Sequence, residues 1–362
     1  MGNRTALYDK HLEAGAKIVD FAGWDMPINY GSQIKEHEQV RSAAGIFDVS
    51  HMTVVDITGN DAEKYLRHLL ANDVAKLDEP GRALYSAMLN LDGGVVDDLI
   101  VYRMNTGYRL VVNCATRMKD LKWMANQSSG FSVFIDEKPK LAILAVHGPT
   151  AIETACSVLA AEQADAVKKL GNFRGVEFDD WFVARTGYTG EKGLEFIFPQ
   201  QQAPELWDKL LAAGVLPVGL AARDTLRLEA GMNLYGQDMD DQTSPLSANM
   251  GFSIAWEPAE RDFIGREAVS VHKRLVESGD FPVLVGLVLE ERGVLRPGQK
   301  LITDKGEGVI TSGSFSPTLK HSIALARIPV LSASCKADIR GNLTPVRIVK
   351  PNFVRFGKNV VE

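Results

Sequence analysis

Cysteine is scarce in this chain, and the three that occur, Cys114, Cys156 and Cys335, are far apart. No C-x-x-C pair is present, and none of the seven histidines belongs to an H-E-x-x-H motif. Those spacings are typical of zinc sites and redox pairs, so we expect no metal and no disulfide pairing. Scattered, unpaired cysteines indicate a reducing compartment, which predicts a cytoplasmic protein.

Long apolar runs and an excess of positive charge are also missing. No stretch approaches the roughly 20 apolar residues that cross a bilayer, and the N-terminal MGNRTALYDKHLEAGAK has no signal-peptide or transit-peptide pattern. The net charge is -6, whereas a phosphate backbone is bound by a basic surface. The sequence therefore predicts neither a membrane nor a nucleic acid as partner.

The chain does have enough material for more than one domain. Its 362 residues, 45% of them hydrophobic, exceed a single ordinary core. From about Phe281 the sequence changes to short strands with frequent Gly and Pro, a texture typical of a small β-barrel or sandwich. The polar segment KRLVESGDFP just before it predicts a boundary, so we expect one region at 1–278 and a barrel at 279–362.

Before that boundary, strands and helices follow one another twice in a similar order. The first unit has a helix at 34–44, a strand through IFDVSHMTVVDITG that ends at Gly59, and a helix at 62–70. That helix carries an apolar stripe of Tyr65, Leu66, Leu69 and Leu70. Three strands between 85 and 113 and a helix at 116–124 follow. No doubly wound parallel pattern occurs, so the class is α+β with antiparallel sheets.

The second unit begins with a buried strand at 141–147. Thr150 and Glu153 match a capping box, which predicts a helix start at that point. The strands WFVAR and LEFIF then flank the loop 186–193, and two further helices follow, PELWDKLLAAG and LAARDTLRLEAG.

The stretch from Tyr85 to Asn113 contains the first candidate for chemistry. Asp92-Gly93 predicts a tight hairpin turn, so Val95–Arg103 is expected to be a central strand with alternating faces. Asp98 then shares a face with apolar and aromatic neighbours, while Asp97 faces the side of Arg103 at the wet end. Burying a carboxylate in such surroundings costs free energy unless the group is hydrogen-bonded or has a function, a profile typical of a catalytic or ligand-binding acid. The alternative is that both aspartates simply cap strand ends in water.

A second candidate lies in TGYTGEKGLE, residues 186–195. A hairpin here would put Tyr188 in the loop and Glu195 on the returning strand, beside Ile197. A strand carboxylate can accept two N–H donors from the edge of a flat heterocycle. Alternatively, Glu195 pairs with Arg185 across the hairpin.

Arg223 and Arg227 lie four residues apart and therefore on one helix face. Such a pair can hold a carboxylate tail or an acidic partner surface. The alternative is local pairing with Asp224 and Glu229. Ser50 and His51 are expected to be neighbours in a strand that point in opposite directions, which makes His51 a satisfied structural histidine and not part of a triad.

Several motifs together resemble the aminomethyltransferase family, the T-proteins of the glycine cleavage system. They recur in this order along nearly the whole chain: FAGWDMP, FDVSHM, NLDGGVVDDLIVYR, ARTGYTGEKGLE, GLAARDTLRLEAGMNLYGQDM, FIGREA, GVITSGSFSPTL and IALARIP. The resemblance implies a three-domain cloverleaf with tetrahydrofolate in its central hole. Two interleaved antiparallel sheet-and-helix domains, roughly 1–50 with 138–278 and 51–137, would precede the C-terminal β-barrel.

The resemblance also implies a reaction. A methylene unit passes from the aminomethyl group on lipoylated H-protein to tetrahydrofolate, with release of ammonia and formation of 5,10-methylenetetrahydrofolate. The family's acid falls on Asp98, which would act near N10 of the folate. The pterin-binding glutamate falls on Glu195 and a folate-contacting arginine on Arg223. Further residues similar in position to the lining of the folate pocket are Tyr188, Met52, Tyr85, Tyr102 and, in the C-terminal tail, Arg355.

Related folate proteins offer alternatives. Sarcosine and dimethylglycine oxidases carry a fused flavin domain, yet no G-x-G-x-x-G opens this chain. Folate proteins of iron-sulfur assembly have K-G-C-Y where this chain has Asn233-Leu-Tyr-Gly. A folate-dependent demethylase acting on sulfonium compounds is the nearest enzymatic alternative, and a non-catalytic folate-binding protein is the other.

Overall fold

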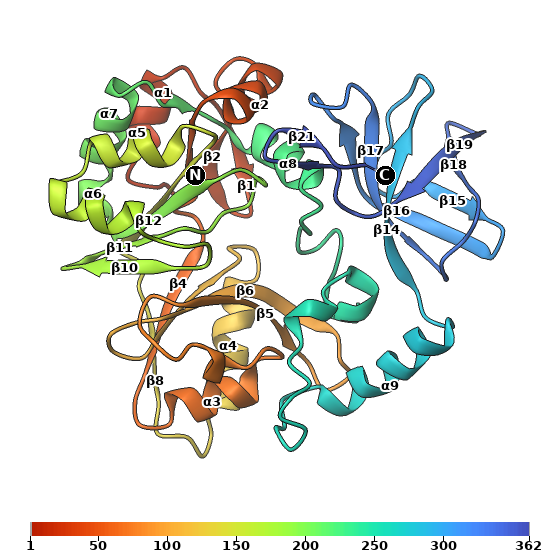
Figure 1. Cartoon of the computed structure of the whole chain (residues 1–362), viewed down its shortest axis with the longest axis horizontal. Helices are drawn as coiled ribbons and strands as arrows, with labels where there is room; N and C mark the ends of the chain where they lie inside the picture. The colour runs from red at the N-terminus through yellow and green to blue at the C-terminus, as the bar shows by residue number, and fades with distance from the viewer. Residues whose placement is uncertain (1, 362) are drawn as a thin grey trace. The chain divides into compact units, whose positions relative to one another are not determined.

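Two sheets and a closed barrel form the framework of the computed structural model, which describes residues 2–361 (Figure 1). The chain divides into two compact units. Unit 1 consists of Met1–Glu63, Ala75–Leu84 and Ile100–Leu226, and unit 2 of Lys64–Val74, Tyr85–Leu99 and Arg227–Glu362. The α+β class with a C-terminal barrel is confirmed. The domain limits at 1–278 and 279–362 stay a prediction.

A six-stranded sheet in unit 1 has the order β10-β11-β12-β9-β3-β13. Its strands are β3 (Gly45–Asp48), β9 (Leu141–His147), β10 (Gly175–Phe178), β11 (Trp181–Ala184), β12 (Gly193–Pro199) and β13 (Leu216–Pro217). All neighbours are antiparallel except β13 and β3, which form one short parallel pair. The strands expected at 141–147, WFVAR and LEFIF are therefore confirmed.

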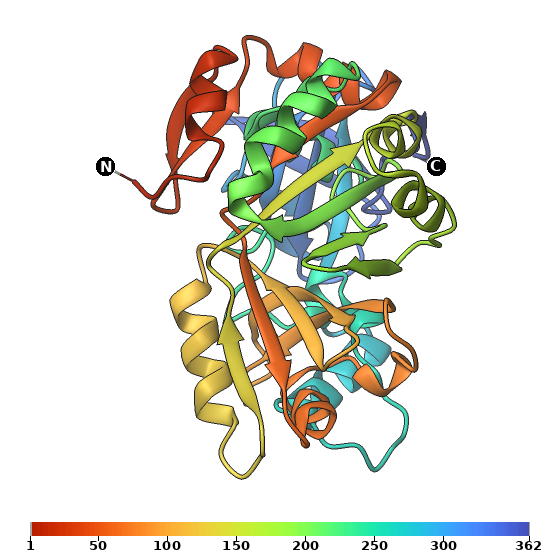
Figure 2. The same cartoon turned by 90° about the vertical axis from the view of Figure 1, so that its left-hand side faces the viewer.

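Both faces of this sheet are buried. One face is covered by α5 (Ala151–Ser157), α6 (Ala161–Lys168) and α7 (Ala203–Ala212), as Figure 2 shows. Phe196 and Phe198 of β12 point to that side, where they join a cluster that contains Trp207. Ile197 points to the other side. Because side chains alternate along a strand, Glu195 also points to this second face.

The second face packs on a separate apolar cluster. It includes Val40 of α2 (Gln33–Ser42), Tyr102, and Leu226 of α8 (Leu220–Glu229). These residues come from distant parts of the chain, so the second face of the sheet brings together segments that are far apart in sequence. The Glu195 carboxyl points to this face.

The five-stranded sheet has the order β5-β6-β7-β4-β8. Its strands are β4 (Thr53–Thr58), β5 (Ala83–Leu89), β6 (Val95–Arg103), β7 (Tyr108–Val112) and β8 (Phe134–Glu137). The central strand expected at Val95–Arg103 is confirmed with the same bounds. The helices α3 (Ala62–Leu69) and α4 (Arg117–Gln127) follow β4 and β7 in sequence. The predicted stripe of Tyr65, Leu66, Leu69 and Leu70 is fully buried, as expected.

The single strand expected up to Gly59 is wrong. The chain makes β3 and β4 in two different sheets, with a turn between them in which the Met52 N–H donates to Val49 O at 3.0 Å. The Asp48 side chain accepts from the Ser50 N–H at 2.9 Å, a local bond that competes with strand pairing. Ser50 and His51 therefore lie in a turn.

The expectation of a wet Asp97 is also wrong, because its side chain is fully buried. The N-terminal end of β6 is covered by a later segment, and the Val95 N–H donates to the carbonyls of Asp240 and Thr243 at 3.1 and 3.0 Å. A side chain at Gly94 would lie 1.8 Å from Asp241 O, so the close approach needs glycine.

The capping box at the start of α5 is only half confirmed. Thr150 is the N-cap residue, as predicted, but its side chain makes no capping hydrogen bond. Thr150 itself has helical backbone angles, which differ from the extended geometry that a capping box needs.

The barrel in unit 2 closes in the order β14-β17-β16-β15-β18-β19. Its strands are β14 (Val283–Leu289), β15 (Lys300–Thr303), β16 (Gly306–Phe315), β17 (Ser322–Ile328), β18 (Cys335–Ile339) and β19 (Asn342–Val349). Alternate residues such as Val285, Leu287 and Leu289 fill the interior. The long helix α9 (Arg266–Ser278) precedes it. The all-β texture of the C-terminal region is thus confirmed as a barrel.

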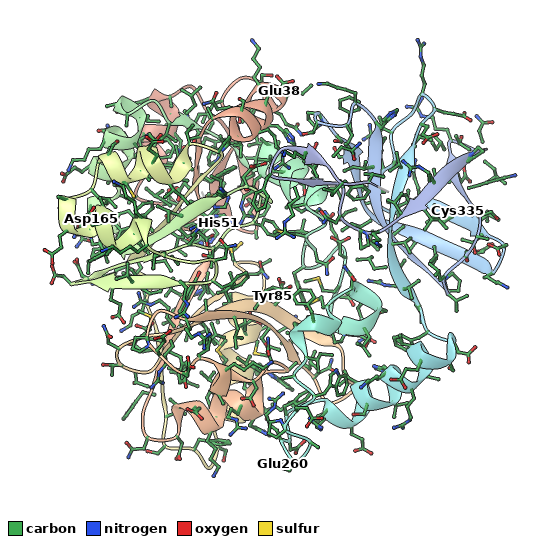
Figure 3. All side chains as sticks on the ribbon, viewed as in Figure 1. Glu38, His51, Tyr85, Asp165, Glu260 and Cys335 are labelled. Carbon is green, nitrogen blue, oxygen red and sulfur yellow. The ribbon has the colours of Figure 1, made fainter. Side chains whose placement is uncertain are left out.

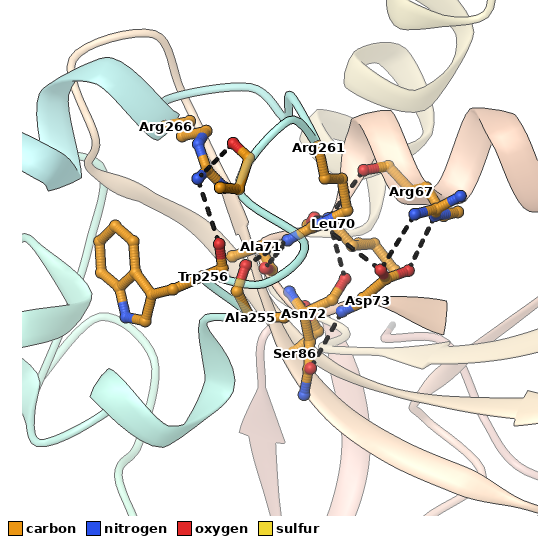
Figure 4. Close-up of polar contacts among 11 residues, drawn as sticks. Arg67, Leu70, Ala71, Asn72, Asp73, Ser86, Ala255, Trp256, Arg261 and Arg266 are labelled. Atoms are coloured by element: carbon orange, nitrogen blue, oxygen red, sulfur yellow. Dashed lines mark hydrogen bonds and ion pairs between the residues drawn. The ribbon is translucent and has the colours of Figure 1, made fainter. Parts of the chain in front are cut away.

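Arg261 fastens the segment before α9 to the end of α3 (Figure 4). Its guanidinium donates to the carbonyls of Arg67, Leu70 and Ala71 at 2.8, 3.1 and 2.6 Å, and to that of Ala255 at 2.9 Å. The last carbonyls of a helix have no N–H donors within the helix, and Arg261 donates hydrogen bonds to those of α3 and the residues after it.

The remaining elements are short. They are α1 (Tyr8–Glu13), β1 (Lys17–Phe21), β2 (Trp24–Asn29), β20 (Val354–Arg355), β21 (Lys358–Asn359) and the 3-10 turns η1 (Val74–Lys76), η2 (Gln200–Gln202), η3 (Pro245–Ala248) and η4 (Gly251–Ser253). Among the helices of residues 2–361, none has the length and apolar composition of a membrane span.

Candidate functional site

Glu195 belongs to a short chain of hydrogen bonds on the second face of the six-stranded sheet. The Thr186 hydroxyl donates to Glu195 Oε2, and the Tyr102 and Thr186 hydroxyls are 2.8 Å apart. Since the one hydroxyl proton of Thr186 goes to Glu195, Tyr102 donates to Thr186. The two hydroxyls therefore orient the carboxylate from the side of β6.

The surroundings of Glu195 change its acidity. Burial raises the pKa of this carboxyl, and the Thr186 hydroxyl, the Arg223 charge and the Tyr102 hydroxyl oppose that rise without cancelling it. Burial, together with the charge of Glu195, raises the pKa of Tyr102 well above its ordinary value. The alternative pairing of Glu195 with Arg185 is wrong, because Arg185 Nη1 donates to Leu170 O at 2.7 Å.

Arg223 and Tyr188 form a second pair in unit 1. The guanidinium carbon of Arg223 lies 4.5 Å from the centroid of the Tyr188 ring, a cation–π contact. Both side chains are half-buried. The positive charge of Arg223 reaches Glu195, so this part of the unit combines one cation, one carboxyl and two aromatic rings.

Arg227 does not share the role of Arg223. It is buried and forms an ion pair with Asp238 at 2.9 Å, and it donates to Ser312 Oγ at 3.0 Å. The local pairing with Asp224 and Glu229 is wrong for this residue. A sequence separation of 11 between the partners explains why no helix spacing predicted it.

Buried side chains of Arg41 and His147 hold the loop 186–193 in place. Arg41 Nη1 donates to Thr189 O at 2.8 Å and forms an ion pair with Glu191 at 2.7 Å, and the two side chains are only 7% and 3% exposed. His147 Nδ1 is 2.8 Å from the Thr189 hydroxyl. A side chain at Gly187 or Gly193 would collide with the His147 ring, so these glycines make room for a histidine. Sequence reasoning missed Arg41 and His147.

Two buried histidines lie within electrostatic reach of Arg223. Burial, reinforced by Arg223, lowers the pKa of His51 to about 4 and that of His147 to about 3. Both imidazoles are therefore neutral near pH 7. A satisfied structural histidine is expected at position 51, and within residues 2–361 its buried Nδ1 has no hydrogen-bond partner from the protein. Its ring instead meets Phe21 edge-on at 5.4 Å.

In unit 2, Asp98 is joined to Tyr85, which lies on the five-stranded sheet (Figure 3). The Tyr85 hydroxyl donates to Asp98 Oδ2 at 2.9 Å, and both residues are half-buried. The Tyr85 ring stacks on Phe252 with 5.8 Å between centroids. The alternative of two aspartates in open water is wrong, because Asp97 is fully buried and Asp98 is held by a tyrosine.

The two remaining predicted residues have simpler surroundings. Met52 is half-buried and packs against the apolar cluster that contains Phe47 and Tyr102. Arg355 is exposed in β20, with its guanidinium 5.4 Å from the Phe356 ring. Residues 2–361 contain no cluster of three or more His, Cys, Asp or Glu side chains able to hold a metal ion.

Both parts of the chain match models of known protein families. Residues 7–258 match the GCVT N-terminal domain, and residues 283–355 match the glycine cleavage T-protein C-terminal barrel domain.

The similarity to individual proteins extends over the full length. The chain is 60% identical over 361 residues to an aminomethyltransferase of Chromobacterium violaceum, covering 99% of each, and 55% identical over 363 residues to that of Pseudomonas syringae pv. tomato, covering all of both. A crystal structure of the glycine cleavage system aminomethyltransferase T from Bartonella henselae superposes with a TM-score of 0.88 at 33% identity, covering 98% of each chain. This chain therefore belongs to the glycine cleavage T-protein family and is an aminomethyltransferase of the glycine cleavage system.

Proposed function

We propose that this enzyme takes the aminomethyl group from the lipoyl arm of lipoylated H-protein and passes its methylene carbon to tetrahydrofolate. Ammonia leaves, and 5,10-methylenetetrahydrofolate is the product. Family membership supports tetrahydrofolate and H-protein as the two partners. The observation that carries the assignment of residues is the Asp98 carboxylate, half-buried and hydrogen-bonded by the Tyr85 hydroxyl.

Asp98 is proposed as the acid of the reaction. A carboxylate that accepts a hydrogen bond from a tyrosine hydroxyl keeps a fixed direction, and a positioned carboxyl group can transfer a proton. It would act at the N10 region of the folate and move a proton while the methylene is delivered. Tyr85, which makes that hydrogen bond, would also line the folate pocket.

Glu195 and Arg223 are proposed as the groups that recognise the folate. A carboxylate kept in place by Thr186 can accept N–H donors from the edge of the pterin. The Arg223 guanidinium on Tyr188 offers a fixed positive charge beside an aromatic face. Tyr102 and Met52 would complete the wall on this side, and Arg355 would contact the folate from the C-terminal tail.

Other parts of the proposal concern the protein as a whole. We propose a two-region chain, 1–278 and 279–362, a division supported by family matches that end at 258 and restart at 283. The first region would hold two interleaved domains, 1–50 with 138–278 and 51–137. We also propose a cytoplasmic location, because the three cysteines are scattered and form no disulfide within residues 2–361, and a reaction without a metal.

The test is the Asp98→Asn variant, which keeps the shape of the side chain and removes its charge. Transfer from loaded H-protein should fall by about 10²- to 10⁴-fold, the usual contribution of a positioned acid or base. Tetrahydrofolate affinity, measured by isothermal titration, should change little. Asp92→Asn on the same hairpin is the control, because Asp92 is exposed and should tolerate the change. Near-normal turnover in Asp98→Asn would disprove the role of Asp98.

A substrate comparison separates the alternatives. The enzyme is given tetrahydrofolate with either loaded H-protein or a sulfonium methyl donor. Ammonia and methylene-folate from H-protein support the proposal, whereas methyl-folate from the sulfonium donor would indicate a demethylase. Folate binding without either product would indicate a binding protein.

A further inference from the structure

Phe252 is an exposed aromatic residue whose neighbours in the chain are buried. Its side chain is 72% exposed, although its neighbours Met250 and Ser253 are 1% and 0% exposed. The backbone around it is hydrogen-bonded: the Met250 N–H donates to Pro245 O at 2.8 Å, and the Ser253 N–H donates to Met250 O at 2.9 Å. Packing of unit 2 therefore fixes the backbone of η4 and leaves the phenyl ring outside the core.

The ring of Phe252 is connected to the proposed acid through one residue. It stacks on Tyr85 with an angle of 21° between the rings, and the Tyr85 hydroxyl donates to Asp98 at 2.9 Å. All three residues belong to unit 2. A single exposed apolar side chain is common on a protein surface. What sets Phe252 apart is that its ring stacks on Tyr85, the residue whose hydroxyl holds the proposed acid.

We propose that Phe252 is a positioning residue of the transfer reaction, which covers the one-carbon unit near Asp98 and keeps water away from it. The inference rests on the proposed function, because it needs a folate bound beside Asp98. Its ring and the Tyr85 ring form one aromatic wall, against which the bound folate would lie. Such a wall adds contact area and removes water from the place where the carbon changes hands.

The chemistry explains why water must be kept out. In the productive reaction the carbon–sulfur and carbon–nitrogen bonds of the aminomethyl group break, the sulfur leaves as a thiol and the nitrogen as ammonia. The carbon forms its two new bonds to N5 and N10 of the folate, which lose their protons. If a water molecule takes the same carbon, the products are formaldehyde, ammonia and the thiol. Water thus competes with folate for one carbon, with no oxidant or reductant in either route.

The experiment measures where the carbon goes. Loaded H-protein and tetrahydrofolate are mixed with each variant in the presence of an excess amine trap that captures free formaldehyde before it condenses with tetrahydrofolate. Ammonia, methylenetetrahydrofolate and trapped formaldehyde are counted in the same reaction. In Phe252→Ala, formaldehyde formed per ammonia should rise at least about fivefold, because the site is open to water. The KM for tetrahydrofolate should rise by about three- to tenfold, the usual effect of losing one aromatic contact.

Two control variants separate this effect from a general disturbance. Phe252→Trp keeps an aromatic ring and should retain the coupling of ammonia to methylenetetrahydrofolate. Phe134→Ala removes an equally exposed phenylalanine, 71% exposed in β8, and should match the unmodified enzyme in every product. Thermal unfolding should change little in any of these variants, since both phenylalanine rings are largely exposed.

Each outcome decides the matter. Uncoupling in Phe252→Ala with rescue in Phe252→Trp supports the inference. A Phe252→Ala enzyme that stays fully coupled overturns it, while loss of transfer in Asp98→Asn would still support the proposed function. If the unmodified enzyme forms no ammonia from loaded H-protein, the proposed function fails and this inference fails with it.

Discussion

At the scale of single residues, each unit contains one proposed functional carboxylate that accepts a hydrogen bond from a hydroxyl group. Glu195 accepts from Thr186, and Asp98 accepts from Tyr85. A hydroxyl orients a carboxylate without neutralising it, whereas an arginine in the same place would occupy both oxygens. Such partners are compatible with the roles proposed for Glu195 as an acceptor of N–H groups and for Asp98 as a group that moves a proton.

Glu195 should make stability depend on pH. Burial raises the pKa of this carboxyl in the folded chain above its ordinary value of 4.5. At pH values between 4.5 and the raised pKa, Glu195 is protonated in the folded chain and ionised in the unfolded chain. The contribution of this group to the free energy of unfolding therefore falls as pH rises through this range. Glu195→Gln removes the ionisation. It should increase the free energy of unfolding above this range and leave it unchanged below it.

Removing the Glu195 carboxylate should weaken ligand binding, although it should stabilise the fold at high pH. Glu195→Ala should weaken tetrahydrofolate binding by about 10- to 100-fold, because hydrogen bonds to a charged group are lost. Urea unfolding from pH 4 to pH 8 and isothermal titration are the two measurements. Unchanged folate affinity, or a Glu195→Gln variant that is less stable at high pH, would contradict this prediction.

At the scale of elements, the loop 186–193 is the segment most exposed to disturbance. It carries Thr186 and Tyr188, and its shape depends on the buried ion pair of Arg41 and Glu191. Arg41 comes from α2 and precedes Glu191 by 150 residues. A loop with three glycines has many alternative shapes, so this anchor decides which one is populated.

Arg41→Met should destabilise the protein by about 3–5 kcal/mol, since it leaves Glu191 buried without its partner. The double variant Arg41→Met, Glu191→Gln should recover much of that loss, because no unpaired buried charge remains. Urea unfolding measures both, and folate titration shows whether the loop keeps its shape. Equal stability of the single and double variants would mean that the ion pair is not the anchor.

At the scale of the whole molecule, the barrel has its own interior but shares polar contacts with the chain before it. Glu229 accepts from Ser316 and Thr318, and Asp238 accepts from Thr311 and Ser312. Leu228 packs in the same cluster as Leu284 and Phe353. The predicted boundary between 278 and 279 lies outside every barrel strand. A barrel that begins at 279 would nevertheless lack Leu228, Glu229 and Asp238 as contacts.

A fragment of residues 279–362 should fold into a β structure with reduced stability, and a fragment of 227–362 should be clearly more stable. The longer fragment keeps Glu229 and Asp238 as acceptors for buried barrel hydroxyls, whose loss costs about 1–3 kcal/mol for each unsatisfied group. Circular dichroism during heating compares the two. Equal melting temperatures would show that the barrel owes nothing to residues 227–278.

Local features of the chain were predictable from the sequence. The alternation in VVDDLIVYR predicted β6 with its correct bounds, and the apolar stripe around Tyr65 predicted the buried side of α3. Both signals come from neighbours within one element, where geometry has a fixed period. The resemblance of the motifs predicted the family, which the comparisons confirm.

The sequence by itself thus determined β6, the buried stripe of α3, the barrel texture and the family of this protein. Only the tertiary structure decided that Asp97 is buried, that Arg227 pairs with Asp238, and that Thr186 stands between Tyr102 and Glu195. Tyr102 and Thr186 are 84 positions apart. No periodic pattern spans such a distance, because the contact exists only after the strands and loops between the two residues have packed.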